Sequence, residues 1–363
     1  MAGGEVLGDE GGSHQGEFYG DGRPARPVRR PCPDGRAGGT VPAMDSDVIV
    51  VGGGVVGLTA AVRLAERGRR VRVWSRDEAG ATTSAVAGAL WWPYRIEPEA
   101  EVGDWSLATL RVYEGLAADP AATGVRLVPG VHADTALDTL GAWAKEVEGL
   151  RQLAPHEVPG PYQAGLAARL PLVDMPVHLA WLRGRLEAAG GSVERHVVTD
   201  LGEAFAAGAR VVVNCTGLGA RGLVPDAGMR AVRGQLVLVE NPGVDTWFTA
   251  ADGASAETTY FFPQPGRLIL GGTAEEDDER LSPDPAVTAG IIARCARIRP
   301  EIADARVLGH RVGLRPARAG GVRLEAERRP DGGLLVHDYG HGGAGVTVAW
   351  GCADRVAELV GDA

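Results

Sequence analysis

Apolar and polar positions follow several patterns along this chain, and each predicts a different kind of element. From Asp47 the segment DVIVV is a continuous apolar run, which is typical of a strand buried on both faces. The next segment, VVGLTAAVRLAER, has apolar residues on one helical face, and it is followed by Gly68, a common helix stop, and by the strand-like RVRVW. This order predicts a parallel strand–helix–strand unit.

The pattern changes in the middle of the chain. RGQLVLVENP and TTYFFPQPGRLILGGT read as strands separated by turns, which predicts an antiparallel sheet. Helical patterns also appear at residues 105–116, 178–189, 285–297 and 344–360, and a further strand is expected at 210–214. We therefore expect an α/β plus α+β protein in which a Rossmann-like domain is interleaved with an antiparallel-sheet domain.

Residues 1–43 differ from the rest of the chain. They are rich in Gly, Pro, Arg and acidic residues and have little apolar periodicity, so we expect a disordered leader. The segment lacks the apolar core of a secretory signal, and Met44 directly precedes the first strand. A start codon assigned upstream of the true one, or an expression remnant, would explain this arrangement.

Composition and charge narrow the class of protein. A chain of 363 residues with 45% apolar and 23% charged residues is long enough for two domains of a soluble protein. The net charge of -10 and the absence of a basic run argue against binding to nucleic acid or to an anionic membrane. The longest uncharged run, 48–62, contains three consecutive glycines and is too short for a membrane span.

The cysteines indicate a reducing compartment. Cys32, Cys215, Cys295 and Cys352 are scattered, with no Cys-x-x-Cys pair and no metal-ligand spacing, so we expect neither a disulfide framework nor a zinc site. We therefore expect a cytoplasmic protein.

A nucleotide-binding fingerprint lies between the first strand and the first helix. Gly52, Gly54 and Gly57 form a G-x-G-x-x-G motif at the turn, where a pyrophosphate can bind the amides of a helix N-terminus. The acidic residue that usually ends the second strand is missing, so Arg76 or Asp77 is expected to contact the ribose.

A second glycine cluster near the end of the chain distinguishes FAD from NAD. The segment HDYGHGGAGVTVAWG places Gly340, Gly342, Gly343 and Gly345 before an apolar helical run that begins near Thr347. Backbone amides and a helix N-terminus there would stabilise negative charge at N1 and O2 of a reduced flavin ring. The sequence therefore predicts an extended FAD with contacts at both glycine clusters.

The sequence offers fewer candidates for contacts to a substrate than for contacts to the cofactor. Arg315 precedes Pro316 and so lies in an extended segment, and its planar guanidinium suits a carboxylate, although a lone arginine is more often a solvated surface charge. No serine triad and no paired-carboxylate motif is present. His337 and His341 have metal-ligand spacing only in a helix, which the glycines disfavour, so we expect no metal and place both histidines in structural positions or near the flavin.

Several strings, in this order and spacing, resemble the D-amino-acid oxidase family of flavoproteins. The resemblance runs from Asp47 to the end of the chain, and its most specific parts are the Gly-Leu-Arg-Pro element and the last glycine cluster. The strings are GGGVVG, AGALWWPY, NCTG, RGQ, TTYFFP, GLRPAR, RLE and HDYGHGGAGVTVAWGCA.

The resemblance implies roles for four residues at the substrate. Arg315 matches the arginine that pairs with the substrate carboxylate, and Tyr260 matches the tyrosine whose hydroxyl assists it. The backbone carbonyl of Gly343 matches the acceptor of the substrate amine, and Tyr94 matches a pocket tyrosine.

The resemblance also implies a set of FAD contacts. Glycines and hydroxyls would surround the phosphates, Val197 would contact adenine through its backbone, and the last glycine cluster with Thr347 would face the flavin ring. The complete set is Gly52, Gly54, Val55, Val56, Gly57, Arg76, Asp77, Thr82, Thr83, Ser84, Gly88, Ala89, Leu90, Val197, Thr216, Gly217, Arg315, Gly342, Gly343, Gly345, Val346 and Thr347.

The implied domains are discontinuous. Residues 44–95, 176–230 and 306–363 are expected to bind FAD, and residues 96–175 and 231–305 to form the substrate domain.

The implied reaction is oxidative deamination of a neutral, apolar D-amino acid to a 2-oxo acid, ammonia and hydrogen peroxide. The α-hydrogen leaves as hydride to flavin N5 without a positioned general base, and O2 reoxidises the flavin. The chain departs from the family at Ala256, where animal enzymes carry a lid tyrosine, and at Ala344, where an aromatic residue is common.

Three alternatives stay open. Arg95, next to Tyr94, would suit the side-chain carboxylate of D-aspartate, so a D-aspartate oxidase is one alternative and a glycine or sarcosine oxidase is another. A flavin-binding protein without turnover is the third, although such a protein has no use for a carboxylate-binding Arg315. The expected partners are a small D-amino acid and O2, with a homodimer left open.

Overall fold

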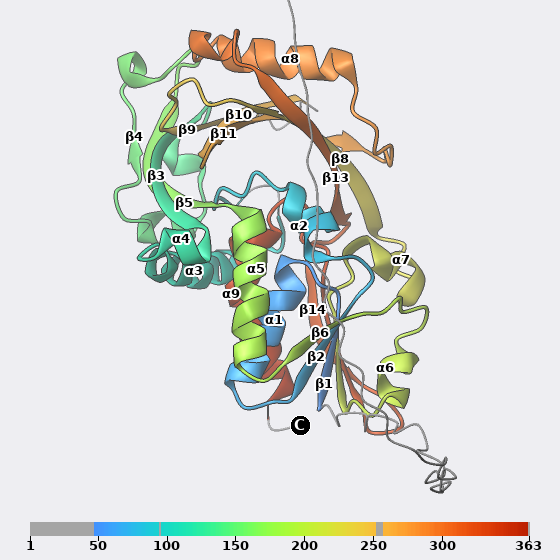
Figure 1. The fold of residues 1–363 in the computed structure, drawn as a ribbon. Helices are drawn as coiled ribbons and strands as arrows, with labels where there is room; N and C mark the ends of the chain where they lie inside the picture. The colour runs from blue at the N-terminus through green and yellow to red at the C-terminus, as the bar shows by residue number, and fades with distance from the viewer. Residues whose placement is uncertain (1–46, 94–95, 252–256, 362–363) are drawn as a thin grey trace, which may run out of the picture. The chain divides into compact units, whose positions relative to one another are not determined.

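The computed structural model describes residues 47–93, 96–251 and 257–361. Its strands form two sheets, one of six strands and one of nine (Figure 1). The predicted disordered leader, Tyr94, Arg95 and Ala256 lie outside the described residues.

The six-stranded sheet has the order β14-β15-β7-β1-β2-β6. Its neighbouring strands from β15 to β6 pair in parallel, whereas β14 pairs antiparallel with β15 at the edge. This arrangement confirms the predicted strand–helix–strand unit as part of a Rossmann-like sheet. The bounds are β1 (Val48–Val51), β2 (Val71–Ser75), β6 (Ser192–Arg195), β7 (Val211–Asn214), β14 (Arg323–Arg328) and β15 (Leu334–Tyr339).

Both faces of β1 are buried, as its continuous apolar pattern predicts. Val48 and Val50 pack with residues of helices α1 and α9, whereas Ile49 and Val51 pack on the opposite face with Leu201 and its neighbours near α6. Helix α5 packs against α1, and α3 against α9. The bounds are α1 (Val55–Glu66), α3 (Glu99–Leu116), α5 (Met175–Ala188), α6 (Gly202–Ala206) and α9 (Gly345–Val360).

The nine-stranded sheet has the order β12-β8-β11-β10-β9-β3-β5-β4, with β13 on the other side of β8. All its pairs are antiparallel except β3 with β9, so the predicted antiparallel sheet is in fact mixed. The bounds are β3 (Val125–Ala133), β4 (Arg151–Gln152), β5 (Gly165–Val173), β8 (Met229–Val239), β9 (Trp247–Ala251), β10 (Glu257–Gln264), β11 (Arg267–Thr273), β12 (Glu275–Glu276) and β13 (Val307–Arg318).

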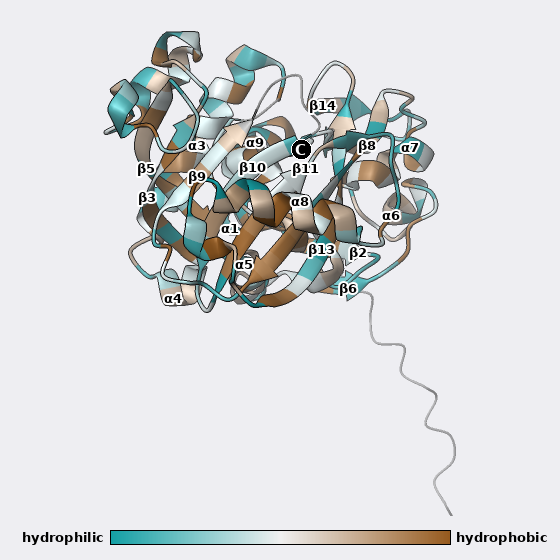
Figure 2. Cartoon of the chain, turned by 90° about the horizontal axis from the view of Figure 1, so that it is seen from above, coloured by the Kyte–Doolittle hydropathy of each residue, from teal (hydrophilic) through white to brown (hydrophobic). Residues whose placement is uncertain are grey.

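Helix α8 (Pro285–Ala296) covers one face of this sheet (Figure 1). Its Ile291 and Cys295 pack with Phe248, Phe261 and Leu268 in a separate apolar cluster. In Figure 2 hydrophobic positions gather inside the fold, and hydrophilic positions lie mostly on the outer segments. The remaining short helices are α2 (Thr83–Val86), α4 (Pro120–Thr123) and α7 (Ala220–Leu223), with single 3-10 turns at residues 79–81, 137–139, 142–146, 155–157, 217–219 and 300–302.

The sheet that contains β13 bears on the predicted domain ranges. Strand β13 falls in the range 306–363 assigned to the FAD domain, yet it pairs with β8 along nearly its whole length, from Val307 opposite Val239 to Arg318 opposite Met229. It therefore belongs to the nine-stranded sheet. Residues 47–361 pack as one compact unit, so a division into two domains stays a proposal.

No helix among the described residues is long and apolar enough to cross a bilayer.

Candidate cofactor and substrate site

A cavity of about 850 Å³ collects most of the predicted site residues. Its volume lies in the upper part of the range for small-molecule and cofactor pockets. Its walls come from both sheets: the β1–α1 turn, the end of β2, strands β8, β10 and β13, and parts of 81–88, 196–199, 215–223 and 338–346.

The fingerprint turn at one end of the cavity has room only for glycine. Gly52 has a φ of +123°, and a Cβ there would lie 2.3 Å from the carbonyl oxygen of Cys215. A Cβ on Gly57 would lie 2.0 Å from the carbonyl oxygen of Gly52. The amide of Val55 donates to Ser84 Oγ at 2.9 Å, which ties the hydroxyl run to the first turn of α1. The backbone at this helix N-terminus is therefore exposed to the cavity in the way that a pyrophosphate requires.

Aromatic side chains lie beside this turn. The rings of Trp74 and His196 stack with centroids 4.1 Å apart, and both residues line the cavity together with Val197. Trp74 and His196 were not predicted as site residues from the sequence. The signal was available in principle, because β2 and β6 pair in parallel and each residue lies at the same carboxyl edge of the sheet.

Arg76 and Asp77, the two candidates for ribose recognition, contact each other. The Arg76 guanidinium lies 2.8 Å from the Asp77 carboxylate, and both residues line the cavity. This contact raises the pKa of Arg76 above its ordinary value. The Asp77 carboxylate is accessible at the cavity edge, but part of its hydrogen-bonding capacity is already used.

The second glycine cluster forms another part of the wall. Gly342, Gly343, Gly345 and Val346 all line the cavity at the start of α9. The amide of Gly342 donates to the carbonyl of Pro316 at 2.9 Å, so this loop is tied to β13 directly after Arg315. The two glycine clusters thus lie on one cavity, as an extended dinucleotide requires.

Three of the expected FAD contacts do not line the cavity. The Thr347 hydroxyl donates to the carbonyl of Trp92 at 3.0 Å and accepts from its amide at 3.3 Å, so the side chain holds the 91–92 segment instead. Ala89 is buried, and Leu90 forms a β-bridge with Leu172. Sequence spacing could not show this, because these residues pair with segments far away in the chain. The remaining expected contacts all line the cavity.

Arg315 and Tyr260 reach the cavity from the nine-stranded sheet. Arg315 Nη1 donates to the carbonyl oxygen of Thr273 at 2.8 Å, and the guanidinium lies over Gly234, where a Cβ would be 2.5 Å from Nη2. The Tyr260 ring lies against Gly271, where a Cβ would be 1.9 Å from Cζ. Both residues therefore line the same cavity as Gly343.

Tyr260 is also fixed by a neighbouring ring. It stacks on Phe262, with centroids 4.8 Å apart and an interplanar angle of 16°. Phe262 in turn lies against Gly88, where a Cβ would be 2.7 Å from the ring, and Gly88 lines the cavity. The stack thus restrains the tyrosine ring at the cavity wall.

A buried group of donors lies behind the second glycine cluster. His341 Nε2 is 3.1 Å from Asp338 Oδ1, and Cys352 completes a set whose donor atoms lie within 4.8 Å of one another. Burial, together with the nearby Asp338 and Cys215, raises the pKa of the Cys352 thiol well above its ordinary value. The expectation that the chain binds no metal stays a prediction from the sequence. His341 lines the cavity, whereas His337 hydrogen-bonds with Asn214 at 3.3 Å.

The site as a whole fits FAD. It has a helix N-terminus with a glycine cradle that suits a pyrophosphate, a second glycine loop at a helix start, and the guanidinium of Arg315 on the same cavity. A Rossmann-like sheet with such a cavity defines the class of flavin-dependent oxidoreductases.

Comparisons with known proteins agree with this class. Residues 47–359 match the family model described as FAD dependent oxidoreductase. A D-amino-acid oxidase from Streptomyces coelicolor is 63% identical over 316 residues, which are 87% of this chain and 97% of that protein. A D-amino-acid oxidase from Rubrobacter xylanophilus is 46% identical over 87% of this chain and 96% of its own length. The chain therefore belongs to the D-amino-acid oxidase family of FAD-dependent oxidoreductases.

A solved structure shows the same fold at lower identity. The glycine oxidase from Geobacillus kaustophilus superimposes with a TM-score of 0.71 and 22% identity, covering 87% of this chain and 94% of that one.

Proposed function

We propose that this protein oxidises neutral D-amino acids with FAD and O2, giving 2-oxo acids, ammonia and hydrogen peroxide. The single observation that carries the proposal is that Arg315, Tyr260 and Gly343 line one cavity together with both glycine clusters. Bound FAD supplies the hydride acceptor for the carbon–hydrogen bond that breaks. The family membership and the relatives above support the same reaction.

Arg315 binds and orients the substrate in this proposal. One Nη is used by the Thr273 carbonyl, and the guanidinium keeps further N–H donors for a carboxylate at the cavity. The Tyr260 hydroxyl adds a donor for the same carboxylate, and the Gly343 carbonyl accepts from the amine. Contacts at the carboxylate and the amine fix which way the α-hydrogen points, and this sets the preference for the D-isomer.

The chain's own residues hold the cofactor at three places. The fingerprint turn with Ser84 binds the pyrophosphate, Trp74 and His196 lie where an adenosine would meet the sheet edge, and the loop 342–346 lies against the flavin. Thr347 makes no contact of this kind, because its hydroxyl bonds to the backbone of Trp92 and neither residue lines the cavity.

The part of the cavity near Arg315 suits a substrate with a neutral side chain best. Among the described residues, the arginines that line the cavity are Arg76 and Arg315, and Arg76 is paired with Asp77 beside the fingerprint turn. Leu281 lines the cavity with 64% of its surface exposed, which offers an apolar contact. D-Aspartate oxidase and glycine or sarcosine oxidase are the alternative proposals, since Arg95 lies outside the described residues.

A peroxide assay over a panel of amino acids tests the substrate class. We expect D-alanine, D-valine or D-phenylalanine to give a kcat/KM at least about tenfold above D-aspartate, because a lone charge in a neutral pocket costs more than about 1.4 kcal/mol. We also expect them to exceed glycine, which has no side chain to bury against the apolar wall. L-Alanine is the control for stereochemistry. A panel in which D-aspartate is fastest would replace the neutral assignment, and one in which glycine is fastest would favour the glycine oxidase alternative.

We further propose a cytoplasmic location. The supporting observations are the scattered cysteines and, in the described residues, three free thiols.

A further inference from the structure

The RGQ string, Arg233-Gly234-Gln235, has no role in the reaction described so far. It lies in β8 directly beside β13, with Gly234 opposite Gly313 and Arg233 opposite Leu314. Successive side chains of a strand point to opposite faces of the sheet. The guanidinium of Arg315 lies over Gly234, and the side chains of Arg233 and Gln235 point away from it into a buried polar network.

Arg233 is the centre of this network, and its side chain is only 1% exposed. Its Nη1 pairs with Glu275 Oε2, and its Nε donates to the carbonyl of Arg280 at 2.8 Å. Its Nη2 donates to the Gln235 side chain at 3.1 Å and to the carbonyl of Ser282 at 2.8 Å. A buried arginine that contacts this many groups fixes the loop 275–284 against the sheet.

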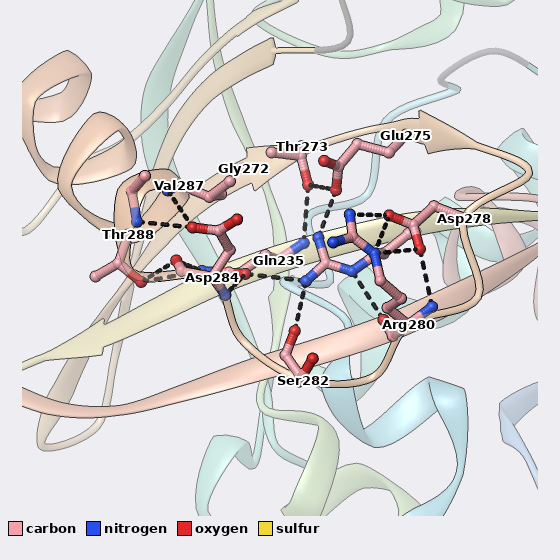
Figure 3. A network of polar contacts seen from close by, with 12 residues as sticks. Gln235, Gly272, Thr273, Glu275, Asp278, Arg280, Ser282, Asp284, Val287 and Thr288 are labelled. Carbon is pink, nitrogen blue, oxygen red and sulfur yellow. Dashed lines mark hydrogen bonds and ion pairs between the residues drawn. The ribbon is translucent and has the colours of Figure 1, made fainter.

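Gln235 holds the other end of the same loop. Its Oε1 accepts from the amide of Asp284 at 2.7 Å, and its Nε2 donates to the Asp284 carbonyl and the Thr288 hydroxyl, each at 2.9 Å. Figure 3 shows these contacts beside those of Thr273 and Glu275.

Thr273 connects the network to the substrate arginine. Its Oγ1 donates to Glu275 Oε2 at 3.2 Å and accepts from the Gln235 amide at 3.1 Å. Its backbone carbonyl accepts from Arg315 Nη1 at 2.8 Å. Thr273 therefore contacts the Arg233–Glu275 ion pair through its hydroxyl and the Arg315 guanidinium through its backbone carbonyl.

We propose that Glu275, Arg233 and Thr273 are positioning residues for Arg315, which act by fixing the Thr273 carbonyl that orients the guanidinium toward the substrate carboxylate. The inference rests on the proposed role of Arg315. The alternative is that the network serves only the stability of the loop 275–284. The two explanations differ in whether the loss of the ion pair changes carboxylate binding through Arg315.

The test is a double-mutant cycle with Glu275→Gln and Arg315→Ala in the FAD-loaded enzyme. Glu275→Gln removes the charge and keeps the side-chain shape, so we expect KM for D-alanine and the dissociation constant of pyruvate, its product, to rise about tenfold. The kcat is expected to stay within about twofold, since the loss is in carboxylate binding. In the Arg315→Ala background the same change is expected to have no further effect, because its route to the substrate is gone.

Glu240→Gln is the matched control. Glu240 pairs with Arg306 at 3.1 Å between the ends of β8 and β13, but both side chains are more than half exposed. It is expected to leave KM and pyruvate binding unchanged. Thr273→Val removes only the hydroxyl, so it is the second variant if Glu275→Gln does not fold, and it is expected to raise KM in the same way.

The outcomes separate the two proposals. If Arg315→Ala leaves KM unchanged, the proposed role of Arg315 fails. If Arg315→Ala raises KM but neither Glu275→Gln nor Thr273→Val does, or if their effects are equally large without Arg315, the positioning role is refuted and Arg315 keeps its own. Melting temperatures and flavin absorbance confirm that each variant is folded and loaded.

Discussion

At the scale of single residues, the substrate end of the cavity depends on glycines that face large side chains. Gly234 leaves room for the Arg315 guanidinium, and Gly271 leaves room for the Tyr260 ring. A methyl group costs less stability at Gly234 than at Gly271. The Arg315 guanidinium is on a long side chain and can move, whereas the Tyr260 ring is stacked on Phe262 and has less freedom.

Gly234→Ala therefore gives a specific prediction. The new Cβ would lie 2.5 Å from Arg315 Nη2, so the guanidinium has to move from its place beside the Thr273 carbonyl. We expect KM for the D-amino acid to rise about tenfold, as for the loss of one charge-assisted hydrogen bond. Steady-state kinetics with the FAD-loaded variant measure this KM.

Gly309→Ala is the control for Gly234→Ala. Gly309 lies in β13 of the same sheet, and a Cβ added there would have no neighbouring heavy atom within 4 Å. We expect unchanged kinetics for Gly309→Ala. If the two variants behave alike, crowding of Arg315 is not the cause.

The sequence could place a residue at the cavity where that residue's own chemistry decides its place. The fingerprint glycines and Arg315 have requirements that no neighbour can change, and all of them line the cavity. Thr347 could not be placed in this way, because its hydroxyl bonds to Trp92, which is 255 positions away in the chain. Glu275 was not singled out, since its importance comes only from the buried Arg233 that it meets.

At the scale of elements, strand β13 could not be assigned to a sheet from its pattern of apolar and polar residues. Its residues alternate weakly and carry several arginines, and the sequence predicted only an extended segment at Arg315. The register with β8, which joins it to the nine-stranded sheet, depends on long-range pairing. The β1–α1–β2 unit needed no such information, because its local pattern and fingerprint already define both the elements and their order.

Helix α5 carries a buried histidine that makes stability depend on pH. His178 is fully buried, with Nδ1 2.9 Å from the Thr123 carbonyl and its ring between Tyr113 and Trp181. Burial lowers its pKa from 6.5 to about 4. The unfolded chain thus binds a proton between these values and the folded chain does not, so stability falls as the pH decreases from 6.5 toward 4.

His178→Asn is expected to reduce this acid sensitivity. Asn keeps a neutral N–H for the Thr123 carbonyl and does not titrate, so the stability lost between pH 7 and pH 5 is expected to shrink by about 2 kcal/mol. Urea unfolding at the two pH values gives the comparison, with exposed His156→Asn as control. An unchanged pH dependence in His178→Asn would show that this imidazole is not responsible. Some dependence should remain, because burial also lowers the pKa of His132 to about 4.

At the scale of the whole molecule, the cavity lies where the two sheets come together. The six-stranded sheet supplies the fingerprint turn and the loop 342–346, and the nine-stranded sheet supplies Arg315 and Tyr260. In the proposed reaction both sets of residues are needed, since the substrate has to be held against the cofactor. The class of reaction was predictable from sequence because each set contains a specific motif.

The most direct measurement of this central claim is the flavin absorbance of the purified, FAD-loaded protein after anaerobic mixing with D-alanine or L-alanine. We predict that D-alanine bleaches the yellow absorbance, that L-alanine does not, and that Arg315→Ala needs about 100-fold more D-alanine, as for the loss of a bidentate charged contact. An enzyme whose absorbance no D-amino acid of the panel bleaches, or which both isomers bleach equally, would contradict the account.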